Sequence, residues 1–389
     1  MTDRPPAAQL AGTRLAAFYR DRRVLVTGHT GLLGTWVVAL LAGCRARPAG
    51  FARGTRTQPP GGIHAVSADI RESGPVVDAM SGAGASVVLH LAAQPQARLR
   101  QRRLTYETNV LGTLNILEGA AALGIPGCVI VSSSRDPARA SPDDRESRDP
   151  YNASKLAAEQ LVLAYRYDAL HADPPRGVAI ARPAVLIGGG DQAAGRLVPD
   201  VMAALRRGEP PGLRTAGHYR PWQHAVEAAS GILWLAALLT REPAGLAAAY
   251  NFGLPSRPAT PVTAGTMAFR LAALWSGPRQ TPGPRQTPGP RQTPGPRQTP
   301  GPRQTPGPRQ TPGPRQDPSG GYWLDCRQAQ ADLGWAPCWT LDTALAATVD
   351  WHRAHAQGSE AAHAVMVGQV ERYTRDAAAA GAAWAQPAG

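Results

Sequence analysis

The sequence predicts an α/β protein built on a doubly wound parallel sheet, with a smaller mixed α/β domain formed mainly by the C-terminal half. Three observations support this prediction. Short apolar, β-branched runs alternate with helical segments over residues 21–180, the first run is followed by a glycine-rich turn, and the pattern changes in the second half. Strands that alternate with helices in this way favour parallel pairing.

The first half supplies most strands of this sheet. The apolar run Arg23–Thr27 precedes glycines and predicts a buried strand, and the apolar run 32–42 after it predicts a helix. The same reasoning places further strands at 87–91, 128–131, 177–180 and 185–187, and helices at 108–123 and 151–165.

The second half is mainly helical. Helices are expected at 197–207, 226–240, 326–333 and 341–355, a strand at 248–252, and an alanine-rich helical tail at 358–383. Five regions follow from these patterns: an N-terminal extension (1–20), the sheet domain (21–180), a second region in two parts (181–276 and 317–357) with some strands returning to the sheet, a repeat insert (277–316) and the tail (358–389).

The insert consists of six Gly-Pro-Arg-Gln-Thr-Pro copies and a final Gly-Pro-Arg-Gln. Two prolines in every six residues remove backbone donors and fix φ, so a disordered, partly polyproline-II segment is expected. It is either a tandem duplication tolerated in a surface loop or a ligand for a proline-recognition domain, although it lacks the PxxP spacing. Without its seven arginines the formal net charge falls from +13 to +6, which argues against a nucleic-acid partner.

Membrane and metal partners are not indicated. The longest apolar runs are far shorter than the ~20 residues that span a bilayer, and residues 1–9 lack the apolar stretch of a secretory signal. The four cysteines show no metal-ligand spacing. We therefore expect a cytoplasmic protein with no membrane contact and no metal site.

A glycine-rich turn joins the first strand to the first helix. Its sequence, GHTGLLG at residues 28–34, fits a tight turn that brings the backbone and a helix N-terminus close to a pyrophosphate. This strand–turn–helix context predicts dinucleotide binding of the Rossmann type. The predicted cofactor contacts here are Gly28, Thr30, Gly31, Leu32, Leu33 and Gly34.

Rossmann sites often carry an Asp or Glu about 20 residues after the glycine-rich turn, and this acid binds the ribose hydroxyls. The present chain has no acidic residue in that region. Arg53 or Arg56 would face a 2′-phosphate there, or both would be solvated surface arginines. The missing acid leans toward NADP, which is left open beside the predicted cofactor, NAD. Asp69, followed by Ile70, would face the adenine amine or cap a helix. The cofactor would also pass the small residues that end the next strand, Leu91, Ala92 and Ala93.

Tyr151 and Lys155 form the central chemical motif. Their i, i+4 spacing places both on one helix face, where an ammonium lowers the pKa of a phenol so that it can accept a proton from a sugar hydroxyl near neutral pH. Lys155 is the single lysine among 41 basic residues, and it would also hold the nicotinamide ribose. Ser133 or Ser134, after the preceding strand, would hydrogen-bond the reacting oxygen.

With these motifs the chain resembles extended short-chain dehydrogenases/reductases of the NAD-dependent epimerase/dehydratase family, and most closely CDP-glucose 4,6-dehydratases. The resemblance runs from about residue 19 to residue 355, interrupted by the insert. It rests on GHTGLLGTW (28–36), HLAAQPQARL (90–99), TNVLGTLNILE (108–118), DPYNASKLAAEQL (149–161), IGGGD (187–191), RLVPD (196–200), RPWQH (220–224), YNFG (250–253) and LDCRQAQADLGWAP (324–337).

The resemblance implies a nucleotide-sugar substrate, an NAD(P)-binding domain at 21–180 and a nucleotide-sugar-binding second region. It also implies a homodimer through the helices at 108–123 and 151–165. Further site residues carried over from the family are Gln94 and Arg98 near the sugar, Arg196 and Arg220 at the nucleotide diphosphate, Leu197 also at the substrate, and Asn109 and Pro183 at the cofactor with Tyr151 and Lys155.

One family feature is replaced. The 4,6-dehydratases carry an Asp-Lys pair directly after the catalytic Ser or Thr, and this pair supplies the base and acid for eliminating water across C5 and C6. If Ser133 is catalytic, Ser134 and Arg135 occupy the pair; if Ser134 is catalytic, Arg135 and Asp136 occupy it, and Asp136 would serve as acid or base. Val185 also stands where the family has Asn.

The sequence thus predicts a nucleotide-sugar 4,6-dehydratase-like enzyme that oxidises sugar C4 with NAD(P). Two alternatives stay open. An epimerase or 4-ketoreductase without dehydration would need only the serine, Tyr151 and Lys155. A degenerate, non-catalytic nucleotide-binding protein would keep the fold without the reaction.

Overall fold

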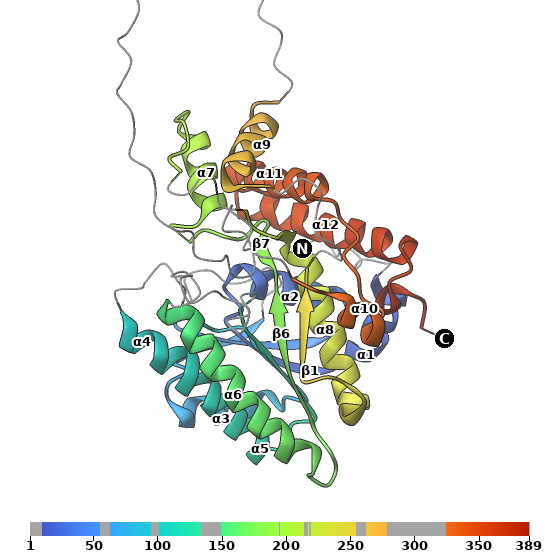
Figure 1. Cartoon of the computed structure of the whole chain (residues 1–389). Coiled ribbons are helices and arrows are strands. Elements are labelled where there is room, and N and C mark those ends of the chain that lie inside the picture. Colours follow the sequence, from blue (N-terminus) through green and yellow to red (C-terminus); the bar gives the residue numbers. More distant parts are fainter. Residues whose placement is uncertain are drawn as a thin grey trace, which may run out of the picture.

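A computed structural model of the chain describes residues 10–54, 63–94, 101–133, 149–193, 195–213, 217, 219–253, 262–277 and 324–388. Seven parallel strands form one sheet in the order β3-β2-β1-β4-β5-β6-β9, with helices on both faces (Figure 1). The strand order changes direction beside β1, as in a doubly wound fold, so the predicted fold class is confirmed. The strands are β1 (Arg23–Thr27), β2 (Arg47–Ala52), β3 (His64–Ser67), β4 (Val87–His90), β5 (Gly127–Val131), β6 (Gly177–Pro183) and β9 (Ala249–Phe252).

Three helices cover one face of the sheet: α3 (Ser73–Ala83), α5 (Gly112–Ala122) and α6 (Pro150–Leu170), which lie together in Figure 1. Successive strand residues point to opposite faces, and Leu25, Val88 and Ile130 point toward these helices. Between β4 and α5 the chain forms α4 (Arg102–Tyr106) and a π-helical turn, η3 (Glu107–Leu111). This face therefore carries the helix that bears Tyr151 and Lys155.

The opposite face is covered by α2 (Leu32–Gly43) and α8 (Ala225–Arg241), and it contains the largest apolar core. α8 is buried along most of its length because α1 (Arg14–Tyr19) and α10 (Arg327–Leu333) also pack against it. α12 (Ser359–Ala379) packs on α2 and on α11 (Leu341–Gln357). None of the described helices is long and apolar enough to cross a membrane.

Both ends of the described chain join this core. The Tyr19 hydroxyl donates to the Leu233 carbonyl at 2.8 Å, and Trp384 in the last turn, η6 (Ala383–Ala385), is fully buried. Thr13 and Pro387 form an isolated antiparallel bridge. The segment from residue 10 and the tail thus pack on the sheet domain.

A smaller core lies beyond the sheet. The two-stranded pair β7 (Val185–Ile187) and β8 (Trp222–His224) packs with α7 (Leu197–Arg206), α9 (Ala264–Ser276) and α11. Its apolar centre contains Ile187, Met202, Met267, Leu271 and Leu345. The predicted insert, from residue 278 onward, lies outside the described residues.

Candidate active site

The turn between β1 and α2 has the geometry of a dinucleotide loop. Gly28 has φ of 69°, and a Cβ there would lie 2.7 Å from the Ala92 nitrogen. A Cβ on Gly34 would lie 2.3 Å from the Gly28 carbonyl oxygen. By contrast, the nearest atom to a Cβ on Gly31, at the N-cap of α2, is 3.4 Å away. Gly28 therefore lets the turn pack against the end of β4, Gly34 lets α2 pack against the turn itself, and Gly31 leaves the helix N-terminus accessible to an anion.

The remaining residues of the predicted loop line the start of α2. Leu32 is buried in the core, whereas Thr30 and Leu33 are half-buried. His29, directly before Thr30, is buried against Gly50 of β2, and burial lowers the pKa of its imidazole. The neutral ring acts as a spacer between the loop and β2.

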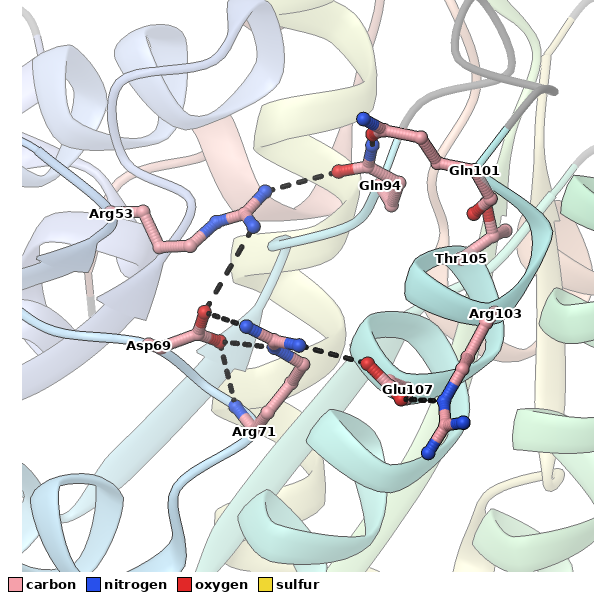
Figure 2. A network of polar contacts seen from close by, with 8 residues as sticks. All are labelled: Arg53, Asp69, Arg71, Gln94, Gln101, Arg103, Thr105 and Glu107. Atoms are coloured by element: carbon pink, nitrogen blue, oxygen red, sulfur yellow. Dashed lines mark hydrogen bonds and ion pairs between the residues drawn. The ribbon is translucent and has the colours of Figure 1, made fainter.

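A polar network crosses the carboxyl ends of β2, β3 and β4 (Figure 2). The Arg53 guanidinium, directly after β2, donates to Gln94 Oε1 at 3.0 Å and lies 3.9 Å from Asp69 Oδ2. Asp69 accepts two side-chain bonds from Arg71, and this contact lowers the pKa of the carboxyl. Arg71 continues the network to Glu107, which also accepts from Arg103.

The helix-cap interpretation of Asp69 does not fit the structure, and its contact with an adenine amine stays a prediction. The N-cap of α3 is Glu72, so Asp69 does not cap that helix. Asp69 instead lies with Ile70 at the end of β3, facing Arg53, where the alternative interpretation places the adenine amine. Arg56 lies outside the described residues.

Gln94 and Asn109 join the end of β4 to the helix that bears Tyr151. Gln94 is fully buried, and its amide donates to Gln101 while its oxygen accepts from Arg53. Asn109, inside the π-helical turn, accepts from the Gln94 nitrogen at 2.7 Å and donates to Ser154 Oγ at 2.9 Å. Ser154 in turn donates to the Tyr151 carbonyl. Sequence reasoning missed Gln101, which follows the HLAAQPQARL segment, and Ser154, which stands inside the Tyr151–Lys155 motif but was given no role.

Two of the predicted catalytic residues, Ser133 and Lys155, lie at the carboxyl end of β5. Asp149 caps α6 by accepting from the Asn152 nitrogen, and Tyr151 stands in the first turn. The Lys155 ammonium is buried and donates to the Val131 carbonyl at 2.6 Å. Ser133 donates to Asn152 Oδ1 at 3.0 Å. Ser134 and Asp136 lie outside the described residues.

Burial sets the charge states around Lys155. Burial lowers the pKa of this ammonium to about 8, and the nearby Glu159 carboxylate opposes the shift. His90, at the end of β4, is fully buried between Thr27 Oγ1 (2.8 Å) and Thr113 Oγ1 (3.1 Å). Burial and the Lys155 charge lower the pKa of His90 to about 3. The imidazole is therefore neutral at pH 7. The one signal in the sequence that could have pointed to His90 is that it is a polar residue in an otherwise apolar strand.

The motif residues of the second region mostly serve packing. A Cβ on Gly189 would lie 2.0 Å from Trp351 Cγ, and the Trp36 indole donates to the Gly189 carbonyl. His224 lies edge-on between the Trp36 and Trp339 rings. The IGGGD and RPWQH segments therefore hold α2, β8 and α11 together.

Polar residues of this region lie beside that packing. Arg196, the N-cap residue of α7, pairs with buried Asp191 at 3.3 Å, and Leu197 begins the helix. Half-buried Arg220 donates to the Tyr219 carbonyl. Pro183 ends β6, while Arg98 lies outside the described residues. Within the described ranges no cluster of His, Cys, Asp and Glu could hold a metal ion.

Known proteins share this architecture. Residues 24–253 match the model of the NAD dependent epimerase/dehydratase family. CDP-glucose 4,6-dehydratase of Salmonella typhimurium is 29% identical over 370 residues, which cover 88% of this chain and 94% of that protein. dTDP-glucose 4,6-dehydratase of Streptomyces griseus is 26% identical and covers 85% of this chain and 94% of its own length.

Solved structures agree at the level of the fold. UDP-glucose 4-epimerase of Thermotoga maritima, solved with UDP-glucose, aligns with a TM-score of 0.63 and 18% identity over 86% of this chain and 99% of that one. dTDP-glucose 4,6-dehydratase of Bacillus anthracis, solved with NAD, aligns with a TM-score of 0.61 and 18% identity over 88% and 99%. The family match spans more than half of the chain, so the protein belongs to the NAD dependent epimerase/dehydratase family.

Proposed function

We propose that the protein is a nucleotide-sugar 4,6-dehydratase-like oxidoreductase in which Tyr151 and Lys155 serve the oxidation of sugar C4. The observation that carries this proposal is the buried Lys155 ammonium at the end of β5, in a chain that has no second lysine. A buried ammonium is costly, and arginine does not offer the same compact, tunable charge. The similarity to CDP-glucose 4,6-dehydratase makes CDP-glucose the first substrate to test.

A nicotinamide dinucleotide fits the residues present. The turn at Gly28 and Gly34 admits no side chain, and the accessible backbone at Gly31 suits a pyrophosphate. Asp69 and the small residues 91–93 would hold the adenosine half. NAD is the expected cofactor, and NADP stays open because an arginine, Arg53, replaces the usual acid. When bound, the nicotinamide takes a hydride from C4 and, in a dehydratase, returns it at C6.

Three side chains have different roles in the proton transfer at C4. The Tyr151 phenolate accepts the proton of the C4 hydroxyl, and the Lys155 ammonium stabilises that phenolate. Ser133 donates a hydrogen bond to the same oxygen. Arg196 and Arg220 would pair with the diphosphate, for which a guanidinium is well shaped. Because burial lowers the pKa of Lys155 only to about 8, the ammonium stays largely protonated at pH 7.

Incubation with CDP-glucose and related nucleotide sugars tests this proposal. A 4-keto-6-deoxy product from folded, cofactor-loaded protein is the expected result, and its absence would remove the dehydratase assignment. The replaced Asp-Lys pair favours a second candidate, a 4-epimerase or 4-ketoreductase. Retention of the C6 hydroxyl in the product would support it. A protein that binds nucleotide but converts no sugar would be the degenerate member.

A homodimer is part of the same proposal. Leu156, Leu163 and Tyr167 on α6 are 37%, 42% and 66% exposed, and Leu111 beside α5 is 50% exposed. These apolar side chains recur along one side of α6 at helical spacing, which suits burial against a second copy. Light scattering on the wild type and on Leu163→Glu tests it: the expected change is from dimer to monomer, and a monomeric wild type would contradict it.

A further inference from the structure

Two charged residues, Glu159 and Arg182, lie near Lys155. Glu159 follows Lys155 by one helical turn on α6 and is 8% exposed, while Lys155 is 4% exposed. Arg182 on β6 donates from Nε to Glu159 Oε1 at 2.8 Å and from Nη2 to Oε2. The two parallel bonds fix the carboxylate in the plane of the guanidinium. The Glu159 carboxylate, held by Arg182 of β6, thus follows by one helical turn the lysine whose ammonium donates to the Val131 carbonyl of β5.

The other ionisable groups around α6 are neutral or bonded to other partners: on α6 itself, buried Arg166 donates to the Val178 and Leu246 carbonyls, and Asp149 caps the helix. His90 on β4 is the group coupled to Lys155 from the sheet, and its lowered pKa keeps it uncharged at neutral pH. Glu107 of η3 is bonded to Arg71 and Arg103 at the protein surface. Glu118 of α5 accepts from the Tyr165 hydroxyl further along α6. Tyr151, one turn before Lys155, is the partner that the proposed function gives to the ammonium.

We propose that Glu159, held by Arg182, is a positioning residue that keeps the Lys155 ammonium protonated, and that Arg182 limits the strength of this effect. The inference rests on the function proposed for Lys155. A carboxylate one helical turn away in a buried setting stabilises the ammonium. The positive charge of the Arg182 guanidinium offsets part of the attraction between the Glu159 carboxylate and the Lys155 ammonium.

The arrangement of Lys155, Glu159 and Arg182 predicts opposite shifts in the pKa of Lys155 for two single variants. In Glu159→Gln the carboxylate is lost and Arg182 remains, so the pKa of Lys155 falls by about one unit. In Arg182→Gln the carboxylate acts on Lys155 without its counter-charge, so the pKa rises by a similar amount. The double variant returns it toward the wild-type value. Packing damage alone would not reverse the sign between the two single variants.

The single lysine allows a direct measurement. Full-length protein carrying 13C-labelled lysine, with a lysine-free tag, gives one side-chain resonance, whose pH titration reports Lys155 without turnover. Glu118→Gln, an acid on the neighbouring α5, is the matched control and should leave the titration unchanged. The alkaline limb of the pH profile for turnover should move with the resonance.

Shifts in one direction for both variants, or no shift in either, would overturn the inference. If Glu159→Gln does not fold, Arg182→Gln alone decides: an upward shift supports the inference and an unchanged titration refutes it. The readout is independent of activity. Opposite shifts in a protein that converts no nucleotide sugar would keep the inference and reject the proposed function.

Discussion

The carboxyl edge of the sheet and the junction of α2, β8 and α11 use similar sequence elements for different purposes. At the edge, glycines of the β1–α2 turn lie against backbone, and a chain of hydrogen bonds runs from Arg53 through Gln94 and Asn109 to α6. At the junction, Gly189 lies against the Trp351 ring, and His224 lies between two indoles. Glycine allows the close approach of backbone in one place and of an aromatic ring in the other.

Residues at the edge are proposed to contact substrate and cofactor, whereas residues at the junction pack the second region on the sheet domain. Substitutions at the edge should affect turnover or cofactor binding while the fold persists. Substitutions at the junction should lower the free energy of unfolding first. The four predictions below test this separation from the largest expected effect to the smallest.

Removing the Tyr151 hydroxyl should have the largest effect. Tyr151→Phe removes the group that exchanges the C4 proton, so turnover should fall by about 10²–10⁴-fold with little change in melting temperature. Steady-state assays and thermal unfolding measure the two quantities. Tyr167→Phe, on the same helix and 66% exposed, is the control and should match the wild type. Equal activity of both variants would place the reacting group elsewhere.

Filling the space at Gly189 should act on the junction. In Gly189→Ala the new methyl group overlaps the Trp351 ring, since its Cβ would lie 2.0 Å from Cγ. The overlap should cost about 3 kcal/mol of unfolding free energy. Gly212→Ala is the control, because no atom lies within 4 Å of a Cβ there. Chemical denaturation compares the two, and identical midpoints would show that the ring yields without cost.

Local sequence signals predicted the edge better than the junction. The turn at Gly28 and the pair Tyr151 and Lys155 are short-range patterns with a fixed geometry, so spacing alone predicted where they lie. The contact of Trp36 with Gly189 joins residues 153 positions apart, which no local pattern reveals. The same limit hid the Arg182 partner of Glu159. The bond from Arg53 to Gln94 was missed because Gln94 was assigned to the sugar by resemblance.

The buried carboxyl of Glu227 should make the junction sensitive to pH. Burial raises the pKa of this group to about 7, although the Cys338 and Trp339 amides donate to it. A pKa above the unfolded value stabilises the fold at low pH, and the stabilisation is lost as pH rises from about 4.3 through 7. Glu227→Gln keeps an oxygen that can accept from the two amides. Because glutamine does not ionise, the variant does not lose stability as the pH rises.

The variant should therefore exceed the wild type by about 3 kcal/mol in unfolding free energy at pH 8, with little difference at pH 4. Denaturation at both pH values provides the measurement. Glu242→Gln, at the exposed end of the same helix, serves as the control. A gain of equal size at both pH values would point to packing rather than to ionisation.

Substitution of Arg53 should give the smallest effect, and we expect it to change cofactor binding alone. Its guanidinium lies after β2, where an acid would bind the ribose hydroxyls, and it is held by Gln94 with Asp69 nearby. A partly exposed guanidinium facing a 2′-phosphate contributes about 1 kcal/mol. Arg53→Ala should therefore weaken NADP binding about 5-fold more than NAD binding. Arg47→Ala, at the opposite end of β2 and paired with Asp21, should leave the ratio unchanged. An equal loss for both dinucleotides would mean that Arg53 only supports the Gln94 network, whereas a larger loss for NADP would identify it as the residue that reads the 2′ position.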